Sequence, residues 1–169
     1  NKNNYSFGYI IGELGRGGQE NQLFILTNQI RLFGHPCSII VWTYNPETKD
    51  RLEILRKRGI KYLLLTNEST FRKIILSRKF LIENSVKTLQ SFSYYLNFCT
   101  YLVTAFLKIR PIGGIRNQLY CYRIDFGFIK FWLNGIFPKY MISNNRSYFE
   151  NMENMLTKLV FKNTKIVVN

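Results

Sequence analysis

The residues best suited to chemistry lie in a glycine-rich segment near the start of the sequence. Gly15, Gly17 and Gly18 fall within the segment Gly12–Gln22, which reads GELGRGGQENQ. The residues before it, Tyr5–Glu13, have the apolar pattern of a buried strand, and apolar residues recur at helical spacing after it. Backbone N–H groups at the start of a helix attract anions. The segment therefore predicts a strand-to-helix turn that faces a phosphate or another anion.

Two familiar phosphate-binding motifs do not fit this segment. Gly15-Arg16-Gly17 begins like the dinucleotide motif, but Glu20 stands where that motif needs a third small residue. The second predicted strand also ends without the acidic residue that holds a ribose. A Walker loop is excluded because no Gly-Lys-Ser/Thr triplet follows the glycines. One alternative stays open, in which the glycines only make a tight turn.

Length and composition indicate one globular domain with a strongly basic surface. The chain has 169 residues, of which 46% are hydrophobic, and this is enough to fill a substantial core. Lys and Arg total 24 against 10 Asp and Glu, which gives a net charge of +14. Such a charge favours anionic partners, namely phosphorylated sugars, acidic lipid headgroups or nucleic acid.

Cysteine and histidine are too few and too scattered for a metal site or a disulfide framework. The cysteines are Cys37, Cys99 and Cys121, no CxxC pair occurs, and His35 is the single histidine. We therefore expect no metal site and a reducing compartment. The segment Phe92–Ile109 comes nearest to a membrane span, but its polar residues indicate a buried or interfacial helix instead.

Short apolar runs alternate with longer helical patterns along the whole chain. This alternation predicts an α/β fold, a Rossmann-like three-layer domain with a mostly parallel sheet of about seven strands. Glycines predict the ends of the first two helices, at Gly34 and Gly59. The predicted strands are Tyr5–Glu13, Cys37–Tyr44, Lys61–Thr66, Val86–Ser91, Pro111–Arg116, Lys139–Ser143 and Lys165–Val168. The predicted helices are Gln19–Phe33, Glu47–Arg58, Ser69–Ile82, Tyr94–Lys108, Arg123–Leu133 and Arg146–Phe161.

The order of short motifs resembles the amino-terminal domain of family 4 glycosyltransferases, which have the two-domain GT-B fold. Leu14–Leu23 matches the family's pattern of a strand, "L-x-x-GG-x-E" and a helix, and Leu32–His35 matches the "GH" turn before the second strand. Three later segments match the fifth, sixth and seventh strands less specifically: Ile112–Asn117, Ile142–Asn145 and Ile166–Asn169. The likeness covers nearly the whole chain, and Gly17-Gly18 with Glu20 is its most specific element.

The resemblance implies a role for the loop and for the ends of two later strands. In such enzymes the amino-terminal domain holds the acceptor, the carboxy-terminal domain holds the nucleotide-sugar, and the sugar is transferred in the cleft between them. The implied reaction is metal-independent and retaining, and it uses the nucleotide-sugar as a co-substrate without a cofactor. The implied loop that faces the donor diphosphate is Gly15, Arg16, Gly17 and Gly18. The implied acceptor or cleft residues are Arg116, Asn117, Asn144 and Asn145, and catalytic residues stay unassigned.

The sequence departs from the family pattern in two ways. The segment Leu89–Tyr94 lacks the histidine that often follows the fourth strand, and we assign His35 a structural place in its turn. The residues that grip the nucleotide-sugar belong to a second domain that residues 1–169 do not contain. We therefore expect either a fragment of a longer enzyme or a subunit that pairs with a separate catalytic chain, inactive in transfer when alone.

The basic charge fits an enzyme of bacterial surface polysaccharide or lipopolysaccharide synthesis, whose acceptor is a glycan or a lipid-linked glycan. Such an enzyme is cytoplasmic, and basic residues can hold it peripherally at the anionic inner face of the membrane. The predicted membrane-facing residues are Arg72, Lys73, Arg78, Lys79, Lys108 and Arg110. Each patch can equally be a solvated face. An alternative function is a non-catalytic domain that binds nucleic acid or an anionic membrane, although the lack of known motifs disfavours nucleic acid.

Overall fold

The computed structural model describes residues 5–116, 119–144 and 165–168, and its centre is a seven-stranded sheet. The strands lie in the order β3-β2-β1-β4-β5-β6-β7, and every neighbouring pair is parallel. The strands are β1 Phe7–Ile11, β2 Cys37–Val41, β3 Lys61–Leu64, β4 Thr88–Ser91, β5 Arg110–Ile115, β6 Tyr140–Ser143 and β7 Lys165–Val168. The predicted α/β fold with a parallel sheet is therefore confirmed.

The described helices connect successive strands, as parallel pairing requires. The α-helices are α1 Gly18–Leu32, α2 Lys49–Lys57, α3 Thr70–Glu83, α4 Asn97–Thr104 and α5 Leu119–Ile136. Two short 3₁₀ turns, η1 Pro46–Thr48 and η2 Tyr94–Leu96, precede α2 and α4. The predicted helix Arg146–Phe161 lies outside the described residues.

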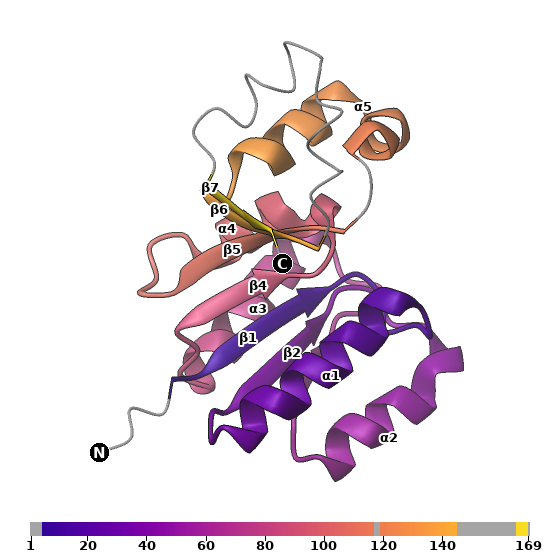
Figure 1. Cartoon of the computed structure of the whole chain (residues 1–169), viewed down its shortest axis with the longest axis vertical. Helices are drawn as coiled ribbons and strands as arrows, with labels where there is room; N and C mark the ends of the chain where they lie inside the picture. The colour runs from indigo at the N-terminus through magenta and orange to yellow at the C-terminus, as the bar shows by residue number, and fades with distance from the viewer. Residues whose placement is uncertain (1–4, 117–118, 145–164, 169) are drawn as a thin grey trace.

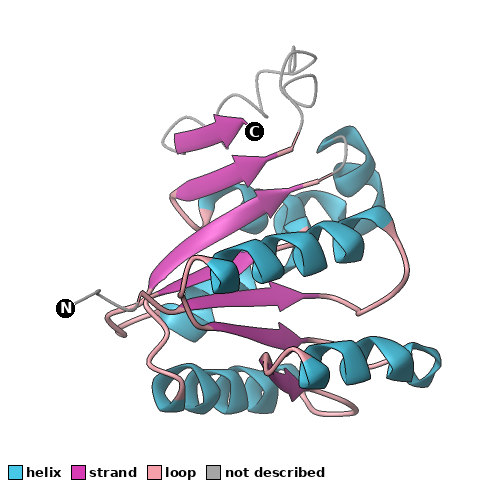
Figure 2. Ribbon diagram, turned by 60° about the horizontal axis from the view of Figure 1, so that its bottom comes forward, coloured by secondary structure: helices cyan, strands magenta, loops and turns pink. Residues whose placement is uncertain are grey.

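The helices form a layer on each side of the sheet (Figures 1 and 2). Alternate residues of a strand point to opposite faces, so β1 contributes to both layers. Tyr9 packs with Leu23 of α1 and Leu55 of α2 in one buried cluster. Ile10 packs in a second cluster with Leu81 of α3 and with residues of α4. This arrangement gives the three layers that the sequence predicts.

The strand order places a crevice at the carboxyl ends of β1 and β4. The chain runs from β1 outward through β2 to β3 and then returns to the other side of β1 as β4. Ligands of open α/β sheets bind outside the strand ends at such a switch point. The loop after β1 contains the glycine-rich segment, and the loop after β4 contains Phe92 and Ser93. Both loops therefore border the place where this fold class binds ligands.

The predicted helix ends are confirmed where glycine ends the helix. Gly34 after α1 has φ +84 and Gly59 after α2 has φ +62, values that favour glycine. The predicted helix Tyr94–Lys108 is shorter in the structure, because the chain turns extended at Ala105 and Phe106 has φ +61. The Arg78 Nη1 atom donates to the carbonyl oxygens of Leu102, Val103 and Ala105, and these bonds stabilise this early end.

A fully buried asparagine connects α4 to the neighbouring strand and helix. The Asn97 Oδ1 atom accepts from the Gly114 N–H at 2.9 Å, and its Nδ2 atom donates to the carbonyl oxygens of Gly114 and Asn134. Asn134 in turn accepts from the Phe98 N–H at 2.9 Å. These bonds fix α4 and α5 against β5. In the described part of the chain, none of the helices is long and apolar enough to cross a bilayer.

Candidate functional site

Hydrogen bonds to two neighbouring loops fix the glycine-rich loop where it leaves β1. The Gly12 carbonyl accepts from the Thr43 N–H at 2.7 Å, and the Gly12 N–H donates to the Ser93 Oγ atom at 3.3 Å. Two residues on, the Leu14 side chain is fully buried. The loop therefore starts from fixed positions beside β2 and β4, and its exposed end projects over the carboxyl edge of the sheet.

The exposed end of the loop is the N-terminus of α1. Gly17 is the N-cap residue, with φ −75 and ψ 179, and its carbonyl accepts from the Asn21 N–H at 3.2 Å. No side chain caps this helix end, and Gly17 and Gly18 are both exposed. A Cβ atom added to Gly18 would have nothing within 4 Å. The first N–H groups of the helix can therefore be approached closely by an anion.

Glu20 brings a negative charge to the same loop. A Cβ atom added to Gly17 would lie 2.7 Å from the Glu20 Oε2 atom, and one added to Gly15 would lie 3.6 Å from Oε1. The carboxylate thus folds back over the glycines, where it also suits the positive end of the α1 dipole. A phosphate that binds to the loop has to displace this carboxylate or bind beside it.

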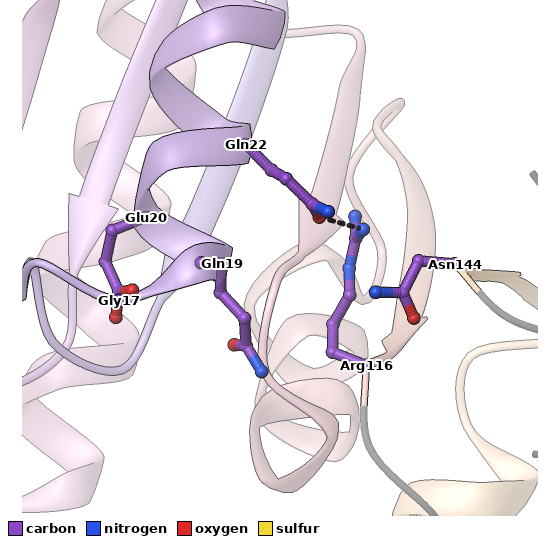
Figure 3. Close-up of a pocket in the computed structure, with 7 residues that line it drawn as sticks. Gly17, Gln19, Glu20, Gln22, Arg116 and Asn144 are labelled. Carbon is purple, nitrogen blue, oxygen red and sulfur yellow. Dashed lines mark hydrogen bonds between the residues drawn. The ribbon is translucent and has the colours of Figure 1, made fainter.

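Arg116 supplies a buried positive charge opposite the loop. It follows β5 directly, and only 9% of its surface is exposed. Its guanidinium carbon lies 4.4 Å from the centre of the Phe92 ring, and its Nη1 atom donates to the Gln22 Oε1 atom at 2.9 Å. Figure 3 shows this bond between α1 and the end of β5. Because arginine keeps its charge at every physiological pH, the pocket has a permanent cation.

These groups line one pocket of about 520 Å³. Asn144, which follows β6, completes it, and its N–H donates to the Ile115 carbonyl at 3.4 Å. The Asn144 Oδ1 atom is buried and accepts no hydrogen bond from the described residues. Figure 3 shows Asn144 beside Arg116. The lining residues are Gly17, Gly18, Gln19, Glu20, Gln22, Arg116 and Asn144.

The structure brings together four of the residues that the sequence predicts for the site. Gly17 and Gly18 line the pocket with Arg116 and Asn144, although these pairs lie far apart in the sequence. The loop residue Arg16 lies elsewhere, because its Nη2 atom is 3.2 Å from the Asp50 carboxylate and its side chain is 70% exposed.

Some of the predicted site residues cannot be placed in the pocket. Gly15 is half-buried and does not line it. Asn117 and Asn145 lie outside the described residues.

Gln22 and Phe92 hold the Arg116 side chain and are not among the site residues predicted from the sequence. Gln22 lies one turn into α1 and Phe92 follows β4. Both positions could have been found from topology, because residues after β1, β4 and β5 meet at one edge of a sheet with this strand order. No local motif marks either residue.

The predicted membrane-facing residues divide into two groups. The Lys73 Nζ atom donates to the Trp42 carbonyl at 2.6 Å, and Arg78 is bonded to carbonyls at the end of α4, so neither head group faces solvent freely. The other four, Arg72, Lys79, Lys108 and Arg110, are exposed. Arg72 forms an ion pair at 3.0 Å with Glu68, which precedes α3, and Lys79 pairs at 3.9 Å with Glu83 within α3.

Residues that could hold a metal ion do not gather within the described ranges. Among the residues that the structure describes, no group of three or more His, Cys, Asp or Glu side chains could hold one. His35 lies in the turn before β2, where the Phe7 ring packs against its ring at 5.9 Å. Its place in that turn agrees with the structural assignment.

The sheet order and the pocket at its carboxyl edge define a Rossmann-like domain of the kind that forms one half of a GT-B glycosyltransferase. No known protein-family profile and no curated protein sequence matches the chain. Solved structures match it across nearly its whole length. HepE of Anabaena, in complex with UDP, aligns with a TM-score of 0.71 at 10% identity, over 97% of this chain and 44% of that protein.

Two further glycosyltransferase structures align in the same way. MurG of Acinetobacter baumannii has a TM-score of 0.62 at 9% identity, over 97% of this chain and 45% of that protein. A glycosyltransferase of Rickettsia africae has a TM-score of 0.61 at 16% identity, over 98% and 42%. The chain therefore spans less than half the length of these three proteins. At these identities the likeness shows the fold.

Proposed function

We propose that this chain is the amino-terminal, acceptor-side domain of a glycosyltransferase that transfers a sugar from a nucleotide-sugar. The observation that carries the proposal is the pocket where the uncapped N-terminus of α1 faces the buried Arg116. Both features favour a bound anion, and they meet at the switch point of the sheet. A complete site needs a second wall, which a carboxy-terminal domain or a partner chain would supply.

In this proposal the pocket holds the diphosphate of the donor. The N–H groups at Gly17 and Gly18 and the Arg116 guanidinium lie where they can stabilise the charge that builds up on the leaving phosphate. Preorganised donors are effective here because Phe92 and Gln22 already fix the Arg116 side chain. Asn144 also lines this pocket, and we assign it a place beside the sugar. The retaining and metal-independent course of the reaction is part of the proposal and rests on the resemblance in sequence.

The solved structures support a nucleotide as the ligand. HepE has been solved with UDP and with UDP-glucose, and each time it aligns over 97% of this chain. UGT2 of Phytolacca americana, which aligns over 96% of this chain and 53% of that protein, was solved with UDP-2-fluoro-glucose and pterostilbene. We therefore expect a nucleoside diphosphate sugar as the donor.

The test is donor hydrolysis or transfer by purified protein that contains this chain, with a broad panel of nucleotide-sugars. Gly18→Asp places a carboxylate at the anion-facing helix end and should abolish turnover and weaken UDP binding, because like charges repel. Asn28→Asp adds the same charge to an exposed position of α1 outside the pocket, and this control should leave both unchanged. Equal behaviour of the two variants, or no reaction with any nucleotide-sugar, would refute the proposal.

We also propose that the enzyme acts in bacterial surface polysaccharide or lipopolysaccharide synthesis, at the inner face of the membrane. Exposed apolar residues of α3 support this location: Phe71, Ile75 and Ile82 are 74%, 49% and 59% exposed and fall on one side of the helix. Arg72 and Lys79 flank this stripe. An apolar stripe beside basic residues suits an anionic lipid surface.

Sedimentation with lipid vesicles tests this location. Protein with Phe71→Ser and Ile75→Ser should bind vesicles of phosphatidylglycerol and phosphatidylcholine less well than the unaltered protein. Ile25→Ser is the matched control, since Ile25 is 64% exposed on α1, on the opposite face of the sheet. An equal loss of vesicle binding in the α3 variant and in Ile25→Ser, or binding that does not depend on the anionic lipid, would contradict a membrane-facing α3.

A further inference from the structure

A second pocket, of about 360 Å³, lies between the end of β2, α4 and α5. Its walls are mainly apolar and aromatic, with Trp42, Leu96, Phe98 and Leu133 among its lining residues. Thr70, at the start of α3, and Lys130, on α5, also line it and are both exposed. Pockets of this size with apolar walls and few polar groups are typical of small-molecule sites.

The walls of this second pocket are held in place by contacts that do not involve a ligand. The Lys73 Nζ atom donates to the Trp42 carbonyl and lies 5.3 Å from the centre of the Trp42 ring. Leu96 is buried, and the Phe98 N–H donates to the Asn134 side chain at 2.9 Å. The second pocket is therefore formed by fixed side chains and does not need a ligand to order it.

Tyr95 separates the second pocket from the glycine-rich loop. Its side chain lines the pocket, and its hydroxyl group lies so close to Gly12 that a Cβ atom at that position would overlap it. Burial raises the pKa of the Tyr95 hydroxyl, and the nearby Glu13 and Glu20 carboxylates raise it further, while a hydrogen bond with Ser93 opposes both. A molecule in the second pocket therefore lies against Tyr95, whose hydroxyl contacts Gly12 at the start of the glycine-rich segment.

The surface around the second pocket is also apolar. Ile129 and Trp132, which flank the lining residues Lys130 and Leu133 on α5, are 73% and 43% exposed. Phe71, next to Thr70 on α3, is 74% exposed. Exposed apolar residues around a pocket mark a site where an apolar ligand or surface binds.

We propose that the second pocket binds the apolar part of the acceptor, so that the acceptor is an amphiphile and not a free polar oligosaccharide. This inference rests on the proposed glycosyltransferase function. The apolar part packs against Trp42, Phe98 and Leu133, and the polar end reaches past Tyr95 to the glycine-rich loop. The apolar rim from α3 and α5 receives whatever portion of the apolar group extends beyond the pocket.

Trp42 offers a direct readout of this binding. The chain contains two tryptophans, so Trp132→Phe leaves Trp42 as its single tryptophan, which can be excited selectively over the tyrosines. Octyl β-glucoside, titrated below its critical micelle concentration into protein with this background, should change the Trp42 emission saturably. Glucose over the same range should not. The measurement needs neither a donor nor turnover.

Variants at the wall and the mouth of the pocket locate the response. Leu133→Gln should raise the half-saturating concentration about tenfold, because it places an unpaired polar group in the apolar wall. Leu107→Gln is the matched control, because Leu107 is half-buried and lies outside the pocket. This substitution should leave the half-saturating concentration unchanged. If Leu133→Gln fails to fold, Thr70→Glu at the exposed mouth should weaken binding in the same direction.

The results that would refute this inference differ from those that would refute the proposed function. If the protein binds UDP but its Trp42 emission is the same with octyl β-glucoside as with glucose, the proposed apolar acceptor site is refuted and the transferase proposal stands. A saturable response that Leu133→Gln and Thr70→Glu leave unchanged also overturns the proposed apolar acceptor site. Protein that binds octyl β-glucoside through Leu133 but neither binds nor turns over any nucleotide-sugar supports the apolar site and refutes the transferase proposal.

Discussion

The guanidinium group of Arg116 stacks on the ring of Phe92, with its central carbon 4.4 Å from the ring centre. The two residues follow β5 and β4, so the contact joins the ends of neighbouring strands. A cation over an aromatic face is attracted by the ring, and more strongly where water is excluded. The contact therefore holds the charge of Arg116 at the pocket while its Nη1 atom bonds to Gln22 on α1.

Arg116→Lys should weaken nucleotide binding while leaving the fold intact. Lysine keeps the charge but loses the planar group that stacks on Phe92 and bonds to Gln22. We expect the Kd for UDP to rise about tenfold or more, and the free energy of unfolding to change by about 1 kcal/mol. Calorimetric titration and urea unfolding measure the two effects.

The matched control is Arg110→Lys, at the opposite end of the same strand. Arg110 is exposed and begins β5, away from the pocket. The Arg110→Lys substitution should leave the Kd for UDP unchanged. If Arg110→Lys and Arg116→Lys have equal effects, UDP binds through general electrostatic attraction to this basic chain, and Arg116 has no specific role.

Gly18→Ala should separate the structural need for glycine from the functional one. Gly18 is the first residue of α1, and an added Cβ atom meets nothing within 4 Å. Alanine also has less freedom in the unfolded chain, so we expect the free energy of unfolding to rise by about 0.4–1 kcal/mol. The Cβ atom projects where an anion would approach, so the Kd for UDP should rise about tenfold. Unchanged affinity would show that the glycine serves the turn alone.

Much of the fold could be predicted from the sequence because its signals are local. Alternating apolar runs place all seven described strands to within a few residues, and Gly34 and Gly59 mark two helix ends through their positive φ angles. The fourth helix ends early for a reason that local pattern does not contain. Its end is fixed by Arg78, which comes from another helix and bonds to three carbonyls there.

The candidate site was predictable only in part, because it is assembled from distant segments. Gly17 and Gly18 have a recognisable motif, and Arg116 and Asn144 are found once each strand end is known. The contacts of Arg116 with Gln22 and Phe92 depend on strand order, which the sequence pattern does not specify. The exposed ion pair of Arg16 with Asp50 likewise depends on how α2 packs beside the loop.

Asn97→Leu should destabilise the domain substantially. The side chain is fully buried and bonds to the backbone of Gly114 and to the Asn134 carbonyl. Leucine has the same number of side-chain heavy atoms, branched at the same carbon, but leaves these groups without their partner, which costs about 1–3 kcal/mol for each buried group. Urea unfolding should therefore show a loss of about 2–4 kcal/mol. Asn28→Leu, at an exposed position of α1, is the control and should change stability by less than about 0.5 kcal/mol.

Stability should fall at alkaline pH through the buried thiol of Cys37. Burial raises the pKa of this thiol from 9.0 to about 11, although the nearby Arg31 opposes the shift. Well below pH 9 the thiol is protonated in both the folded and the unfolded chain, and its full contribution to the free energy of unfolding is present. As the pH rises from 9 through 11, the unfolded chain loses the proton first, so the equilibrium moves toward unfolding. A pKa difference of this size is equivalent to about 2–3 kcal/mol, lost by the upper end of that range.

Urea unfolding at intervals between pH 8 and pH 10 measures this dependence. The buried hydroxyl of Tyr9, whose pKa is also raised by burial, adds its own dependence toward pH 10, and it does so in both of the proteins compared. The experiment uses a Cys99→Ala background, because burial raises the pKa of the Cys99 thiol as well, against the opposing charge of Lys73. Adding Cys37→Ala should lower stability at pH 8 through lost packing but flatten its decline toward pH 10. Parallel declines in the two proteins would show that the Cys37 thiol titrates alike in the folded and unfolded chains.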